Sequence, residues 1–306
     1  PLRAGRQAVS RALNDARVER RQIDHLGVGH PGDLDLQRGL CVLWHNVTGW
    51  RDVPLRSKLQ EAFRMEVTLD DRSRAIALAE RRTSPEDGTH PNAMYVQVGT
   101  GIGMGIFVDG RLYRGATQAG GEIGNLVIDP AGALCSCGKR GCVEAYATIG
   151  AVLRYVRDSL AAGAQWLGPG APGRLDEITI DMVAAAADQD GGVAAAALER
   201  AGTALGLGVA NAVQILNPSL VVLCGRLARL ARDRLLEPVG RTVRQRCVET
   251  ASRGLEIRIS RPKKDISAIG CALLAAEAEA QRIVRSRLSD VLAACGPQKL
   301  RTGRKQ

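Results

Sequence analysis

The hydrophobic pattern along this chain switches between short unbroken apolar runs and apolar positions at helical spacing. Unbroken runs predict buried strands at residues 25–29, 67–70, 94–98, 220–225 and 255–259. Helical spacing predicts helices over 5–21, 55–63, 71–80, 145–160, 180–187, 193–216, 227–250 and 268–276. Strands that alternate with helices in this way predict an α/β fold.

Proline and glycine mark the boundaries between these elements. The sequence His30-Pro31-Gly32 predicts a turn directly after the first strand. The segment 163–173 is rich in both residues and predicts a surface loop, and Asn217-Pro218 ends the long apolar helix before it.

Alternate glycines follow the strand at 94–98 and open the sequence Gly99-Thr100-Gly101-Ile102-Gly103. A tight hairpin between two strands is the ordinary explanation of such a pattern. The same glycines can also bare several backbone amides to a phosphate group, so a nucleotide-binding turn remains open.

Three of the eight cysteines, Cys135, Cys137 and Cys142, fall within one short glycine-containing segment. Thiolates at such short spacing suit a zinc ion, which takes Cys sulfur in a tetrahedral shell. The alternative is a loop of reduced, idle thiols. Glu122 precedes this segment and Glu144 follows it, so two carboxylates flank the predicted metal site.

The segment reads Cys-x-Cys-Gly-x-x-Gly-Cys-x-Glu, with Gly-Glu-Ile-Gly before it, and resembles the zinc loop of the ROK family (repressor, open reading frame, kinase). The resemblance extends over about residues 24–280. It implies an α/β, actin-like or ribonuclease-H-like two-lobed fold. Residues 1–95 would form a smaller first lobe, incomplete at its N-terminus, and 96–264 a larger lobe that holds the loop 122–144. A helix at about 265–290 would pack back on the first lobe, and the basic tail 297–306 is expected to be disordered.

The resemblance also assigns residues to a sugar or effector site, namely Asp70, Asp71, Glu122, Asn125 and Glu144. Asp71 matches the catalytic base of the family's kinases and would be catalytic only if this chain is a kinase. A plainer interpretation makes Asp70 and Asp71 the N-terminal cap of the helix that follows. Asn125 stands where the family has a zinc-binding histidine, so zinc is expected to be structural and to lack that ligand.

Kinase activity would need ATP and Mg²⁺, and the resemblance places their site at Gly99, Thr100, Gly101, Gly103 and Gly225. The family's kinases open with Asp-x-Gly-Gly-Thr and its repressors open with a winged helix-turn-helix. Neither occurs in this chain, so we expect an N-terminal region to be absent.

Composition adds one charge argument. The chain has 42 Lys and Arg against 32 Asp and Glu, a net charge of +10. An excess of positive charge favours polyanionic partners in general. Neither a secretory signal nor an apolar stretch of membrane-spanning length is found by inspection, and thiols in a metal-like cluster suit a reducing compartment. We therefore expect a cytoplasmic protein without a membrane partner.

Together these features predict the effector-binding and oligomerising part of a sugar-responsive transcriptional regulator. Its partners would be a sugar or sugar phosphate, further copies in a homodimer or homotetramer, and DNA contacted through the absent N-terminal domain. An ATP-dependent hexose kinase of the glucokinase type and a degenerate member that serves as an interaction module remain alternatives. Whether the chain is an enzyme is left open.

Overall fold

The computed structural model describes residues 2–44, 47–188, 192–261 and 264–295. The strands are β1 (His25–His30), β2 (Asp33–Asp35), β3 (Leu40–Leu43), β4 (Arg51–Val53), β5 (Glu66–Asp71), β6 (Ala93–Val98), β7 (Ile102–Val108), β8 (Arg111–Tyr113), β9 (Leu220–Cys224) and β10 (Glu256–Ile259). The α-helices are α1 (Leu2–Ala16), α2 (Leu55–Phe63), α3 (Arg72–Thr83), α4 (Glu144–Ala147), α5 (Ile149–Ala161), α6 (Ile180–Ala186), α7 (Val193–Leu216), α8 (Arg226–Ala231), α9 (Asp233–Arg246), α10 (Glu249–Ser252) and α11 (Ile266–Cys295).

The larger sheet has the order β10-β9-β6-β7-β8, with β9 parallel to β6 and β10, and β7 antiparallel to its neighbours. Successive side chains of a strand point to opposite faces. Met94 and Val96 therefore enter the core shared with α7 and α9, whereas Tyr95 enters the core shared with α3 and α11. Burial on both faces explains why β6 reads as an unbroken apolar run.

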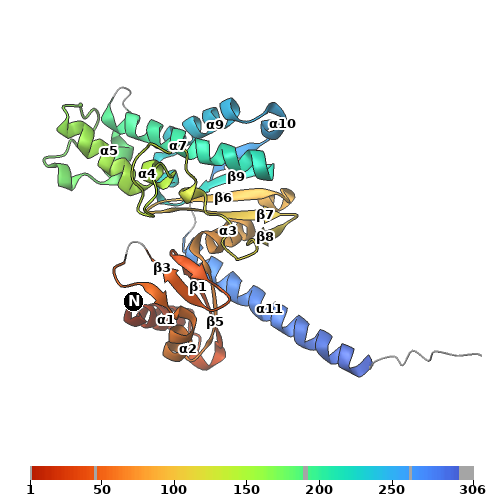
Figure 1. The fold of residues 1–306 in the computed structure, drawn as a ribbon. Coiled ribbons are helices and arrows are strands. Elements are labelled where there is room, and N and C mark those ends of the chain that lie inside the picture. Colours follow the sequence, from red (N-terminus) through yellow and green to blue (C-terminus); the bar gives the residue numbers. More distant parts are fainter. Residues whose placement is uncertain (1, 45–46, 189–191, 262–263, 296–306) are drawn as a thin grey trace, which may run out of the picture.

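A second, smaller group of strands lies apart from this sheet (Figure 1). Strands β1 and β5 pair in parallel, and β2, β3 and β4 form an antiparallel sheet. Their apolar side chains make a separate core with α2, which contains Cys41, Leu55, Leu59, Val67 and Leu69. The chain thus has two regions with separate hydrophobic cores.

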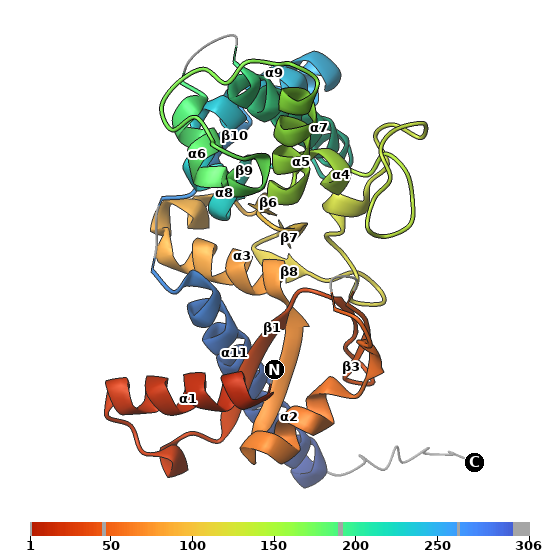
Figure 2. The same ribbon diagram turned by 90° about the vertical axis from the view of Figure 1, so that its left-hand side faces the viewer.

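Helices α3 and α11 connect the two regions. Figure 2 shows α3 beneath the larger sheet and α11 running from α3 along β1 of the small strand group. Their close approach depends on glycine. A Cβ atom on Gly27 would lie 1.7 Å from the carbonyl oxygen of Cys271, and one on Gly270 would lie 2.0 Å from that of Ala75. Backbone of α11 therefore lies directly against β1 and α3.

The predicted strands at 25–29, 67–70, 94–98, 220–225 and 255–259 are confirmed, and every end lies within one residue of its predicted position. The helix stop at Asn217 is confirmed too, because this residue takes a left-handed φ of 43° as the cap of α7. The loop 163–173 contains no helix or strand. The predicted tail 297–306 lies outside the described residues.

Some predicted boundaries were wrong. The single helix expected over 227–250 is three helices, because Arg232 takes a φ of 45° between α8 and α9, and Cys247 is extended. The helix expected over 145–160 breaks at Thr148, whose hydroxyl caps α5 by accepting the N–H of Ala151. The small strands β2, β3, β4 and β8 were not predicted.

Helix α7 is long and apolar enough, by length and composition, to cross a membrane. It is mostly buried against α9 and the larger sheet, and Gly202 and Gly206 let α9 approach it closely. Core helices of this kind pass the same test as membrane spans, so the finding is weak evidence for a span.

Candidate functional site

A pocket of about 540 Å³ lies where segments from both regions meet. Its wall contains Asp71, Thr100, Gly101, Gly103, Glu122, Asn125, Cys135, Cys137 and Glu144, so most of the predicted site residues are brought together. Asp70, Gly99, Cys142 and Gly225 do not line it. The remaining wall comes mainly from residues 31–33, Trp44, Arg72, Gln97 and the start of α5.

Asp71 ends β5 and begins α3 in the pocket wall. Its Oδ1 accepts the backbone N–H groups of Ser73 at 2.7 Å and Arg74 at 3.2 Å, so it is the N-terminal cap of the helix. A carboxylate in this position complements the positive helix end. The capping interpretation is confirmed for Asp71, which nonetheless remains at the pocket surface.

Asp70 has a different environment from its neighbour. Strand geometry points it away from the pocket, and its carboxylate is only 2% exposed. Oδ1 accepts from Arg74 Nε at 2.5 Å and Oδ2 from Arg114 Nε at 2.9 Å. The sequence-based expectation that Asp70 contacts a sugar, or caps the helix, is therefore not supported by its position.

The glycine segment forms the predicted hairpin, with Val98 paired to Ile102. Glu144, at the start of α4, approaches this turn and its Oε1 accepts the Ile102 N–H at 2.6 Å. A Cβ on Gly101 would lie 3.1 Å from the same oxygen. The turn thus holds a carboxylate, which occupies the Ile102 amide.

Glu122 directly precedes a short 3₁₀ turn, Ile123–Asn125, which ends at Asn125 in the pocket wall. Asn125 Nδ2 donates to Glu122 Oε2 at 3.4 Å, whereas Asn125 Oδ1 is buried and has no hydrogen-bond partner among the described residues. Desolvation in the pocket, and then the charges of Asp71 and Asp33, raise the pKa of Glu122, although the side chain stays partly open to solvent. The pocket is therefore rich in acceptors.

Several pocket residues were not identified from the sequence, among them Trp44, Gln97 and Arg154, since nothing in their local pattern marks them. Gln97 Oε1 accepts from Arg72 Nη2 at 3.4 Å and from the Ser73 hydroxyl at 3.5 Å. Trp44 and Arg154 come from segments far away in the chain. Only the folded structure brings them to the same wall.

His30, which the sequence places in a turn, is buried beside the pocket but does not line it. Its ring stacks on Trp50 at 5.6 Å and meets Trp44 edge-on at 4.9 Å. Burial lowers the pKa of His30, and its Nδ1 accepts the Gly32 N–H at 3.0 Å. This environment is that of a neutral packing residue.

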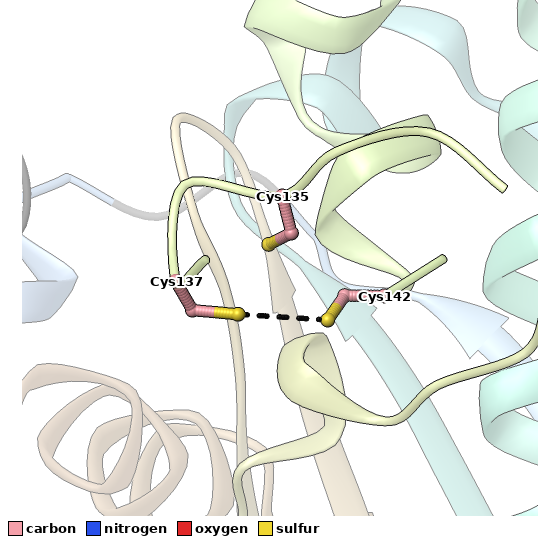
Figure 3. Close-up of side chains that lie close together, drawn as sticks. All are labelled: Cys135, Cys137 and Cys142. Carbon is pink, nitrogen blue, oxygen red and sulfur yellow. Dashed lines mark hydrogen bonds between the residues drawn. The ribbon is translucent and has the colours of Figure 1, made fainter. Parts of the chain in front are cut away.

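The cysteine segment folds into a compact loop that brings the side chains of its three cysteines together (Figure 3). Sulfur atoms of Cys135, Cys137 and Cys142 all lie within 4.8 Å of one another, and those of Cys137 and Cys142 are 3.6 Å apart. Gly141 takes a φ of 70°, and a Cβ there would lie 1.6 Å from the Asp129 carbonyl oxygen. Glycine is therefore required at this position for a steric reason.

This sulfur arrangement fits a tetrahedral metal ion. Zn–S bonds of about 2.3 Å place neighbouring sulfurs roughly 3.8 Å apart, close to the separation of Cys137 and Cys142. Burial alone would raise the pKa of Cys137, but hydrogen bonds from the Lys139 backbone and the neighbouring thiols outweigh it and lower that pKa. Burial raises the pKa of Cys142 to about 12. These three cysteines can bind a metal ion.

Comparison with known proteins gives relatives of two kinds. A xylose repressor of Caldicellulosiruptor bescii is 32% identical over 251 residues, which is 80% of this chain and 61% of the repressor. A glucokinase of Halalkalibacterium halodurans is 29% identical over 274 residues, 89% of this chain and 82% of the glucokinase. This chain therefore spans less than two thirds of the repressor's length.

The solved structures agree with these relatives. A ROK hexokinase from Thermus thermophilus superposes with a TM-score of 0.72 and 29% identity, covering 92% of this chain and 87% of the hexokinase. The expected actin-like, two-lobed α/β fold is thereby confirmed. The ROK family matches residues 4–278, and the chain belongs to this family.

Proposed function

We propose that this chain is the effector-binding and oligomerising part of a sugar-responsive transcriptional regulator. The observation that carries the proposal is the acceptor-rich pocket, in which Asp71, Glu122, Asn125 and Glu144 share one wall. Carboxylates accept hydroxyl hydrogen bonds strongly. A ligand that supplies many donors, such as a sugar, complements this wall.

One feature supports a regulator over a kinase. Arg72 lines the pocket directly after Asp71, where it adds bulk and positive charge beside the candidate catalytic base. The similarity to a xylose repressor agrees with this choice.

The second candidate is an ATP-dependent hexose kinase. It is favoured by the carboxylate of Asp71 in the pocket wall, where a base must stand to accept the proton of an attacking hydroxyl. The similarity to a glucokinase and to a ROK hexokinase supports it as well.

Calorimetric titration separates these candidates. We expect D-xylose, D-glucose or one of their phosphates to bind, and ATP with Mg²⁺ not to bind. Binding of both sugar and ATP, with ADP released, would establish the kinase instead. If every compound in the panel fails to bind, the proposed function is wrong and the interaction module remains.

Glu122 gives the binding reaction a defined pH dependence. Its pKa is raised, and sugar hydroxyls donate hydrogen bonds to the ionised carboxylate. The affinity for the sugar is therefore highest above that pKa and is lost as the pH falls through it. Below the pKa we expect Kd to rise about tenfold per pH unit, the slope of a single linked proton. Glu122→Gln should bind more weakly and lose this dependence, and an unchanged pH profile in that variant would assign the proton to another group.

For the cysteine cluster we propose a zinc ion that stabilises the loop, bound by three protein ligands. Purified protein is expected to carry about one zinc per chain, and Cys137→Ser to carry close to none, because metal affinity depends on each thiolate. Cys247→Ser is the matched control, since Cys247 lies outside the cluster and its thiol donates only to the Ala210 carbonyl. Equal zinc in both variants would contradict the assignment.

The remaining parts of the proposal concern the intact protein. Ligand binding would shift the balance between two arrangements of the regions or of the copies in a homodimer or homotetramer. DNA contact would then change through a domain outside this chain, in the cytoplasm.

A further inference from the structure

The sulfur cluster belongs to the wall of the pocket and not to a remote loop. Cys137 is half-buried and lines the pocket, Cys135 also lines it although only 4% of it is exposed, and Cys142 is fully buried and does not line it. The cluster packs against Ala133, Ala145 and Tyr146. Cys137 is therefore the least enclosed of the three cysteines, and it is exposed on the pocket wall.

A metal ion held there lacks a fourth strong ligand. Among the described residues the group of metal-binding side chains consists of the three cysteines alone, without a fourth Cys, His, Asp or Glu. Structural zinc sites are closed by four protein ligands, whereas sites with three protein ligands keep an exchangeable position. The donor set is that of an open site.

Asn125 offers a hydrogen-bond acceptor of the kind that an exchangeable metal ligand can use. Pairing of Val127 with Cys142 holds the segment that carries Asn125 alongside the cysteine segment. Asn125 lines the same pocket, and its Nδ2 is used by Glu122. Its Oδ1 is a buried acceptor without a partner among the described residues, which is costly unless a donor is supplied.

We propose that Cys135, Cys137 and Cys142 form an open metal centre whose fourth coordination position faces the pocket. An exchangeable oxygen or nitrogen donor fills this position, and Asn125 Oδ1 accepts a hydrogen bond from it. Water fills it in the free protein, and a hydroxyl of a polyol in the pocket can replace the water. The inference rests on the proposed metal site and deepens the proposed sugar site.

Cobalt substitution tests the open position without knowledge of the effector. Co²⁺ bound by thiolates has visible absorption bands that depend on all four ligands. Imidazole is the small ligand used to probe the fourth coordination position. In the wild-type protein we expect about one Co²⁺ per chain and a saturable change of the visible bands when imidazole is added. D-xylose and D-glucose are then titrated in the same way.

Two variants of Asn125 test the role of that residue. Asn125→His supplies an imidazole, a strong metal ligand, and is expected to close the site and reduce the response to free imidazole at least tenfold. Asn125→Ala keeps the site open but removes the acceptor. The nitrogen through which imidazole binds a metal carries no hydrogen, so the response to imidazole should persist unchanged, whereas ammonia, whose metal-bound nitrogen keeps its hydrogens, should bind roughly threefold to tenfold more weakly, as for one lost hydrogen bond. Cys247→Ser should behave as wild type.

The outcomes separate this inference from the proposals on which it rests. Bound cobalt with bands indifferent to imidazole means a closed site and overturns the inference, while the metal proposal stands. Failure to bind any cobalt or zinc overturns both the metal proposal and this inference, while calorimetry still decides the sugar site. Identical ammonia affinity in wild type and Asn125→Ala overturns the part assigned to Asn125.

Discussion

Asp70→Leu is expected to lower the free energy of unfolding by about 3–5 kcal/mol, the cost of leaving a buried charge unpaired. The substitution removes the carboxylate that both Arg74 and Arg114 bind. Arg74 is 2% exposed and cannot reach water. Its guanidinium also donates to the Gly120 carbonyl at 2.9 Å, but this neutral acceptor does not neutralise its charge. Urea unfolding measures the change.

The double variant Asp70→Leu, Arg74→Leu is the control for this prediction. Replacing a buried ion pair by apolar side chains is often neutral or even stabilising, so the double variant should recover most of the lost stability. Recovery would show that the single variant suffers from an unpaired charge. A double variant as unstable as the single one would instead mean that the shape of Asp70 matters more than its charge.

Gly27→Val should have the second largest effect, a loss of at least about 3 kcal/mol or a failure to fold, because overpacking at backbone cannot be relieved by a rotamer change. The added Cβ would fall 1.7 Å from the carbonyl oxygen of Cys271. Strand β1 and helix α11 would have to separate, which also disturbs the core around Leu26 and Val28. Thermal unfolding followed by circular dichroism measures the loss.

Gly150→Ala is the matched control for a glycine in a different setting. Gly150 lies in α5, and an added Cβ there meets nothing within 4 Å. Alanine favours a helix over glycine by about 0.5–1 kcal/mol, so this variant should be as stable as wild type or slightly more so. If Gly27→Val unfolds no earlier than this control, α11 does not pack on β1 as described.

Much of the fold could be predicted because its strongest signals are local. Strands β6 and β9 are apolar runs buried on both faces, and α7 ends at an asparagine that readily takes a left-handed conformation. The break at Arg232 has no local signal, since neither glycine nor proline stands there and the apolar spacing continues across it. Tertiary packing decides such positions.

The candidate site likewise contains some residues with a local sequence signal and others without one. The neighbouring residues Asp70 and Asp71 have identical chemistry, and only strand alternation sends one to buried arginines and the other to the pocket. The cysteine cluster was predictable because its three thiols are close in sequence. Trp44, Gln97 and Arg154 were not, because they join the pocket only through long-range folding.

The separate cores of the two regions have a consequence for unfolding. Leu55, Leu59 and Val67 belong to one core, and Val96 and Leu205 belong to another that shares no residue with it. The pocket takes Asp33 and Trp44 from the first region and Glu144 from the second. A ligand that binds all three residues is a non-covalent cross-link between two cores that could otherwise melt at different temperatures. Saturating ligand would then merge two calorimetric transitions into one.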